Sequence, residues 1–166
     1  MLFKMNAFRV TCIVFILKLA VIDVFALDSA YKQVVYSDLV KDSFEVYVDT
    51  SPNFKSDGRA SVVFYLDANL ALGEEVRRRI DSTKTNTLFV GVGHIGNYRK
   101  LRRRDFIPPK LMNGEWQQSA DKNFGQAANF YKFMKEELMP FINVRYPNNG
   151  EYSLIGHSLS GLFVYY

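Results

Sequence analysis

The stretch of sequence that decides the fold is Tyr152-Ser153-Leu154-Ile155-Gly156-His157-Ser158-Leu159-Ser160-Gly161. Its first four residues predict a short strand, and the apolar residues 162–166 that follow it suit a buried helix. Between them, the pattern Gly-x-Ser-x-small-Gly predicts a strained tight turn. Strand and helix would approach too closely there for large side chains at positions 156 and 160.

The central serine of this turn has the surroundings of a catalytic nucleophile. In a nucleophile elbow, the serine hydroxyl is exposed above the sheet. Ser158 holds that position, and the Leu159 amide lies at a helix start, where unpaired donors and the helix dipole favour developing negative charge. We therefore predict Ser158 as the nucleophile and the Leu159 N–H as an oxyanion donor. Ser160 replaces the glycine of the strict pattern, and the alternative is an ordinary strand-to-helix turn containing serines.

Upstream of this turn, the chain alternates strands and helices. Residues 43–49 alternate apolar and polar side chains, which predicts a half-buried strand. Residues 60–66 and 87–92 are almost continuously apolar, as expected for strands covered on both faces. Residues 70–80 have helical spacing, so strand, helix and strand imply a parallel crossover. A second helix is expected to end at Pro140, with one face carrying Phe130, Phe133, Met134 and Leu138.

Composition and charge exclude several classes of protein. With 166 residues, 48% of them apolar and 15% aromatic, the chain is far too apolar for a disordered protein. A formal net charge of +4 is too small to indicate a nucleic-acid partner without a clustered basic face. The single cysteine, Cys12, lies in the first twenty residues. The rest of the chain therefore has no disulfide, cysteine zinc site or thiol nucleophile.

Residues 1–26 have the layout of a secretory signal peptide. Two basic residues precede the apolar run 10–17, which is too short to span a bilayer. Cleavage is expected after Ala26, which leaves residues 27–166 as a secreted or periplasmic protein without a stable membrane span. Charged residues interrupt the apolar stretch, so an uncleaved N-terminal anchor and a mis-chosen start codon stay open as alternatives.

Two further motifs have simpler explanations. Residues 91–96 match Gly-x-Gly-x-x-Gly, but a dinucleotide site requires this motif to open a helix, and residues 97–100 before two prolines predict a loop. The basic cluster 99–104 is expected to be solvated or ion-paired, with Asp105 as one partner. We expect no nucleic-acid partner, whereas one of these arginines, Arg104, is a candidate to bind an anionic group of a substrate.

Several motifs in chain order resemble those of a known family. They are Tyr65-Leu66-Asp67, Gly91-Val92-Gly93, Arg104-Asp105-Phe106-Ile107-Pro108, Glu137-Leu138-Met139-Pro140-Phe141-Ile142, Arg145-Tyr146-Pro147 and Gly156-His157-Ser158-Leu159. From about Ser43 onward, the chain is similar to the putative esterase family of α/β-hydrolases, and most of all to its siderophore-esterase-like branch of the enterobactin type. S-formylglutathione hydrolases and mycolyltransferases are relatives. The resemblance implies a three-layer α/β/α hydrolase fold with a mostly parallel sheet, truncated at the C-terminus.

The resemblance also implies an activity and a second oxyanion donor. Such proteins hydrolyse small-molecule esters through an acyl-enzyme on the serine and require no metal or organic cofactor. Their second donor is a backbone amide just past the strand that ends in Leu-Asp-Gly, which corresponds here to Leu66-Asp67-Ala68 and points to the amide of Asn69. Because Ala68 replaces the usual glycine, the Ala68 N–H is an alternative donor.

The base and acid of a catalytic triad are not evident in this sequence. Family members place both well downstream of the serine, and only eight residues follow Ser158 here. His157 is expected to pack or to line the pocket rim, and His94 is a less favoured candidate for the base.

Residues 27–166 are also shorter than the roughly 200 residues that a full α/β domain with a triad needs. We expect the N-terminal part of a longer hydrolase, with little or no activity by itself. The alternative is a non-catalytic truncated or decayed fragment that at most binds a ligand. No sequence feature indicates the oligomeric state or the identity of the substrate.

Overall fold

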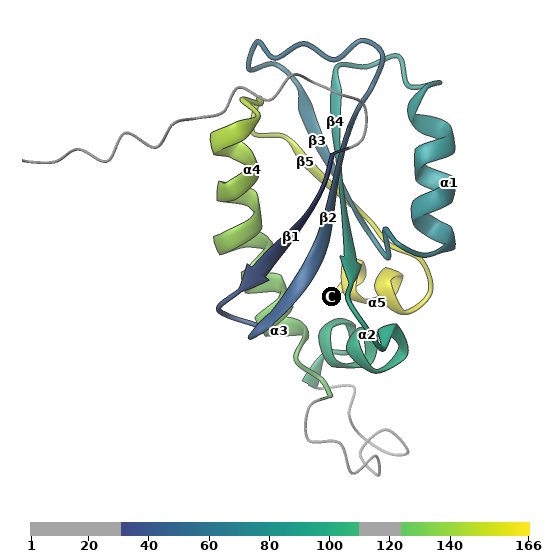
Figure 1. Cartoon of the computed structure of the whole chain (residues 1–166), viewed down its shortest axis with the longest axis vertical. Helices are drawn as coiled ribbons and strands as arrows, with labels where there is room; N and C mark the ends of the chain where they lie inside the picture. Colours follow the sequence, from purple (N-terminus) through teal and green to yellow (C-terminus); the bar gives the residue numbers. More distant parts are fainter. Residues whose placement is uncertain (1–30, 110–123) are drawn as a thin grey trace, which may run out of the picture.

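The computed structural model describes residues 31–109 and 124–166, so the expected signal peptide over residues 1–26, with Cys12, lies outside the described residues. Within them, five strands form one sheet with the order β1-β2-β4-β3-β5. The strands are β1 (Tyr31–Ser37), β2 (Asp42–Thr50), β3 (Ser61–Leu66), β4 (Thr87–His94) and β5 (Tyr152–Ile155). β3 is parallel to both β4 and β5, whereas β2 is antiparallel to β1 and β4 (Figure 1). The expected parallel pairing is confirmed for β3, β4 and β5.

Helices cover both faces of this sheet (Figure 1). They are α1 (Ala71–Ile80), α2 (Tyr98–Phe106), α3 (Ala127–Lys132), the π-helical segment η2 (Phe133–Leu138), α4 (Met139–Arg145) and α5 (Leu159–Tyr165). α1 lies against one face, and α3, η2 and α4 run one after another along the other. α2 and α5 pack together at the end of the sheet to which β4 and β5 point. The predicted three-layer α/β/α hydrolase fold is confirmed.

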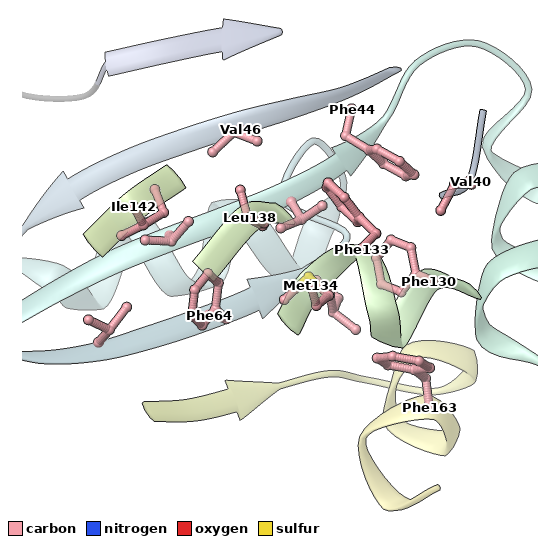
Figure 2. Packing of buried hydrophobic residues seen from close by; sticks show 14 of the residues in the cluster. Val40, Phe44, Val46, Phe64, Phe130, Phe133, Met134, Leu138, Ile142 and Phe163 are labelled. Carbon is pink, nitrogen blue, oxygen red and sulfur yellow. The ribbon is translucent and has the colours of Figure 1, made fainter. Parts of the chain in front are cut away.

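The larger core lies between the sheet and the helices α3 to α4. Phe44 and Val46 of β2 are fully buried on this face, as the apolar-polar alternation predicted. Figure 2 shows Phe44 pointing toward Phe130 and Phe133, and the rings of Phe44 and Phe133 stack with their centroids 4.5 Å apart. Each fully buried phenylalanine stabilises the fold by roughly 1.5–3 kcal/mol. This aromatic cluster therefore holds the helical layer against β2.

A smaller core lies under α1. Tyr65 and Phe89, from neighbouring strands, pack there against Val76 and Ile80 of α1. Every residue of β4 is buried. The prediction that this strand is covered on both faces is confirmed.

Three elements differ from the sequence-based expectation. β1 was not predicted, because it is an edge strand whose less exposed alternate positions 33, 35 and 37 include the polar residues Gln33 and Ser37. Its sequence therefore shows no apolar alternation. Residues 97–100, expected as a loop, instead begin α2: the Asn97 side chain accepts a hydrogen bond from the Lys100 N–H at 3.2 Å and caps the helix.

The helix expected to end at Pro140 continues through it to Arg145. Pro140 occupies the first turn of α4, where a missing N–H is tolerated, and the π-helical segment η2 precedes it. No helix within residues 31–109 and 124–166 is long and apolar enough to cross a bilayer.

Candidate active site

Two turns meet at the edge of the sheet where the parallel strands end. β3 and β5 are neighbours, with Tyr65 paired to Ile155, so the turns that follow them leave from the same edge. The turn after β3 contains residues 67–69 and the turn after β5 contains residues 156–158. Ligands of open α/β sheets bind in the crevice outside the carboxyl ends of the strands.

The turn after β5 has the geometry of a nucleophile elbow. Ser158 is exposed, precedes the first residue of α5 and has φ 57° and ψ −120°. A Cβ atom at Gly156 would lie 2.4 Å from the Ser160 carbonyl oxygen, so a larger residue does not fit at position 156. The buried Ser160 hydroxyl accepts a hydrogen bond from the His157 N–H and donates one to the His157 carbonyl, both at 2.9 Å. Serine at position 160 thus braces the turn in place of the usual glycine.

The backbone of Ser158 stores strain that glycine would relieve. A non-glycine residue in such a sparsely populated region costs about 1–3 kcal/mol, whereas glycine costs about 0.5–1 kcal/mol in chain entropy. We therefore expect Ser158→Gly to be about 1 kcal/mol more stable than Ser158→Ala in urea unfolding. The matched pair Ser153→Gly and Ser153→Ala, in the extended backbone of β5, should show the opposite order. The same order at both positions would contradict a strained elbow.

A groove of about 410 Å³ opens beside Ser158. α5 and the elbow provide Ser158, Leu159 and Leu162, and α2 provides Arg99, Arg102 and Arg103. The three arginines share one face of α2 because residues three and four apart on a helix are neighbours. The nucleophile candidate therefore lies beside a cationic wall. The basic cluster 99–104 is evident in the sequence, but its alignment on one helical face was not predicted, because residues 97–100 were expected to form a loop.

The turn after β3 is held by an ion pair with that wall. Asp67 has φ 57° and is buried. Arg102 Nη2 donates to Asp67 Oδ2 at 3.0 Å, and Arg102 Nε lies 2.8 Å from Asp67 Oδ1. The Ala68 N–H donates to the Val92 carbonyl at 3.1 Å, so this alternative oxyanion donor is already engaged. The Asn69 N–H makes no hydrogen bond within the described part of the chain.

Arg104 does not line the groove. Its guanidinium instead bonds Asp42 and Asp105, each with a nitrogen-oxygen distance of 2.7 Å. Burial lowers the pKa of Arg104, but the hydrogen bonds and charges of these two carboxylates outweigh it and raise the pKa overall. Arg104 thus ties α2 to β2, and its contact with an anionic group of a substrate stays a prediction.

The two histidines have different surroundings. His94 is only 4% exposed, its Nε2 lies 2.9 Å from Asp105 Oδ2, and its ring packs on Phe44 and Phe106. Engaged in this way, His94 is not placed to accept a proton from Ser158. His157 is exposed next to Ser158, although it does not line the groove. Among residues 31–109 and 124–166, no group of three or more His, Cys, Asp or Glu residues could hold a metal ion.

Comparison with protein families finds a match over most of the chain. The model of the family described as "Putative esterase" matches residues 37–166, which is most of the chain. A search of curated proteins found no match.

Solved structures with the same fold include several hydrolases. The BES protein from Bacillus cereus superposes with a TM-score of 0.64 and 26% identity, over 83% of this chain and 57% of that chain. An IroE-like serine hydrolase from Shewanella oneidensis superposes with a TM-score of 0.63 and 25% identity, over 81% of this chain and 44% of that chain. Siderophore hydrolase EstB from Aspergillus nidulans superposes with a TM-score of 0.60 and 23% identity, over 84% of this chain and 53% of that chain. This chain thus spans about half the length of these three solved structures.

Proposed function

Because the chain belongs to the putative esterase family, we propose that it is the nucleophile-bearing part of a serine ester hydrolase. The observation that carries this proposal is the exposed Ser158 at φ 57°, at the start of α5 and beside a groove. The likeness to an IroE-like serine hydrolase at 25% identity supports it. Residues 1–26 would export the protein, and the N-terminus of the secreted form would then be Leu27.

The proposed reaction has two covalent steps. Ser158 Oγ attacks the ester carbonyl carbon while its proton passes to a general base, and the Leu159 and Asn69 amides stabilise the oxyanion. The carbon–oxygen bond then breaks, and the alcohol leaves with that proton. Water attacks the acyl-enzyme in the same way and releases the acid. The site needs no metal or organic cofactor for these steps.

The proposal places the general base outside this sequence. His94 is bonded to Asp105, and the described residues hold no histidine-carboxylate pair at Ser158. A base and its orienting acid would come from segments of a longer protein, so the chain alone would be a poor esterase. The same observation favours a second candidate, a non-catalytic fragment that binds a ligand in the groove.

Covalent labelling distinguishes the two candidates. A fluorophosphonate is expected to label an extended version that supplies a base and its acid, with the adduct mapped to Ser158 by mass spectrometry, and a p-nitrophenyl ester should give a burst. The 166-residue chain should label far more slowly. An extended protein that binds ligands but does not label would contradict the esterase and support the binding protein.

The cationic wall predicts a preference for anionic esters. Arg102 is paired with Asp67, whereas the Arg103 side chain makes no hydrogen bond or ion pair with the residues that the structure describes. We expect Arg103→Gln to raise KM about fivefold for a p-nitrophenyl ester bearing a carboxylate, because one charge-assisted contact at an exposed site contributes about 1 kcal/mol. KM for a neutral ester of equal length should stay unchanged. Arg78→Gln, on the exposed side of α1, is the control. Equal effects on both esters would contradict an anion contact.

A further inference from the structure

The proposed oxyanion donor shares a peptide group with a carbonyl that is bound by an arginine. Arg77 Nη1, from α1, donates a hydrogen bond of 2.8 Å to the Ala68 carbonyl. The N–H of the same peptide group belongs to Asn69. In a trans peptide, the C=O and N–H bonds point in opposite directions. A donor that holds the Ala68 oxygen therefore directs the Asn69 N–H away from Arg77.

The guanidinium of Arg77 is held from several sides. Its central carbon lies 5.3 Å from the ring centroid of Tyr47. On the same side of the sheet, Asp49 accepts a hydrogen bond from the Tyr65 hydroxyl at 3.2 Å. Burial raises the pKa of the Asp49 carboxyl, and the Tyr65 hydroxyl and then the Arg77 charge offset part of that rise. Arg77 is thus a half-buried, oriented cation behind the turn.

The peptide itself has little freedom to rotate. A Cβ atom at Gly73 would lie 1.9 Å from the Ala68 oxygen, so only glycine lets α1 approach this carbonyl so closely. The preceding amide, Ala68 N–H, is bound to the Val92 carbonyl, and the Asn69 side chain donates to the His94 carbonyl at 2.7 Å. Residues on α1 and β4 therefore fix both sides of the turn.

We propose that Arg77 is a positioning residue of the oxyanion hole, which orients and polarises the Ala68–Asn69 peptide so that its N–H stabilises the oxyanion. A cation at the carbonyl withdraws electron density from the peptide, and hydrogen bonds in such a chain strengthen one another. The strengthened N–H acts on charge that develops only as Ser158 attacks, so its effect falls on the transition state. Arg77 itself does not touch the substrate. This inference rests on the proposed function.

The test compares three variants of the extended protein. Arg77→Met removes the donor and the charge, Arg77→Lys keeps the cation, and Arg78→Met is a matched control on the exposed side of α1. We expect Arg77→Met to lower kcat and the rate constant of fluorophosphonate labelling about tenfold, with KM changed less than about twofold. Affinity for a boronic acid that forms a tetrahedral adduct on Ser158 should fall by the same factor. Arg77→Lys should recover part of the loss, and Arg78→Met should match the wild type.

A second measurement uses the 166-residue chain and needs no activity. Arg77→Met should shift the carbonyl carbon resonance of Ala68 and the amide resonance of Asn69, whereas Arg78→Met should leave both unchanged. If Ser158→Ala abolishes labelling but folded Arg77→Met labels at the wild-type rate, the inference is overturned and the esterase stands. If the wild type never labels, the proposed function fails instead. Unchanged Ala68 and Asn69 resonances in Arg77→Met would then also overturn the positioning by Arg77.

Discussion

Ser158→Ala is expected to abolish fluorophosphonate labelling and to lower kcat for a p-nitrophenyl ester by about 10⁴-fold or more in the extended protein. The loss is large because the nucleophile, base and oxyanion hole act as a unit, and without the hydroxyl no acyl-enzyme forms. The oxyanion hole and binding groove would remain, so a small residual rate over water should persist. KM should change little, since the hydroxyl contributes little to binding the ground state.

Ser153→Ala is the matched control for this loss. Ser153 is an exposed serine of β5, five residues before the elbow, and its removal should leave kcat and labelling unchanged. Retention of the labelling rate by Ser158→Ala would show that another residue carries the acyl group and would exclude the proposed mechanism.

Asp105→Ala is expected to destabilise the protein by about 3–5 kcal/mol, the second large effect. Asp105 is fully buried, binds His94 Nε2 at 2.9 Å and receives two hydrogen bonds from Arg104 at 2.7 and 2.8 Å. Removing the carboxylate leaves the half-buried Arg104 guanidinium with Asp42 as its only carboxylate partner among the described residues. Breaking a buried pair from one side removes part of the compensation of the remaining charge, and this is far more costly than losing an exposed pair.

In urea unfolding, this loss of stability should lower the midpoint urea concentration and leave the m-value unchanged. Asp38→Ala is the control, because the Asp38–Lys41 pair has both side chains largely exposed and should contribute less than about 1 kcal/mol. Asp105→Asn can keep a hydrogen bond to His94, so its loss of stability should lie between those of Asp105→Ala and Asp38→Ala. A loss below about 1 kcal/mol for Asp105→Ala would mean that the network does not stabilise the fold.

Much of the fold could be predicted from local patterns. β2 could be predicted because its side chains alternate between a buried and a half-buried face, and β4 because all its residues are buried. Patterns of this kind arise from burial and are therefore visible in the sequence. β1 lies at the sheet edge, and polar residues at its less exposed positions hide the alternation from the sequence. The start of α2 depends on the Asn97 cap, and its polar sequence resembles a loop.

By itself, the sequence determined the strand-turn-helix around Ser158, because Gly156, the serine and the small residue at position 160 meet the steric demands of that turn within six residues. Only the tertiary structure decided which charged groups lie near this turn and how they pair. Arg102 pairs with Asp67 and Arg104 pairs with Asp42, and both ion pairs depend on where α2 packs. Contacts between residues 35 and 62 positions apart leave no local periodicity in the sequence. The physical reason is that helix phase and strand order, which set those contacts, result from burying the whole core at once.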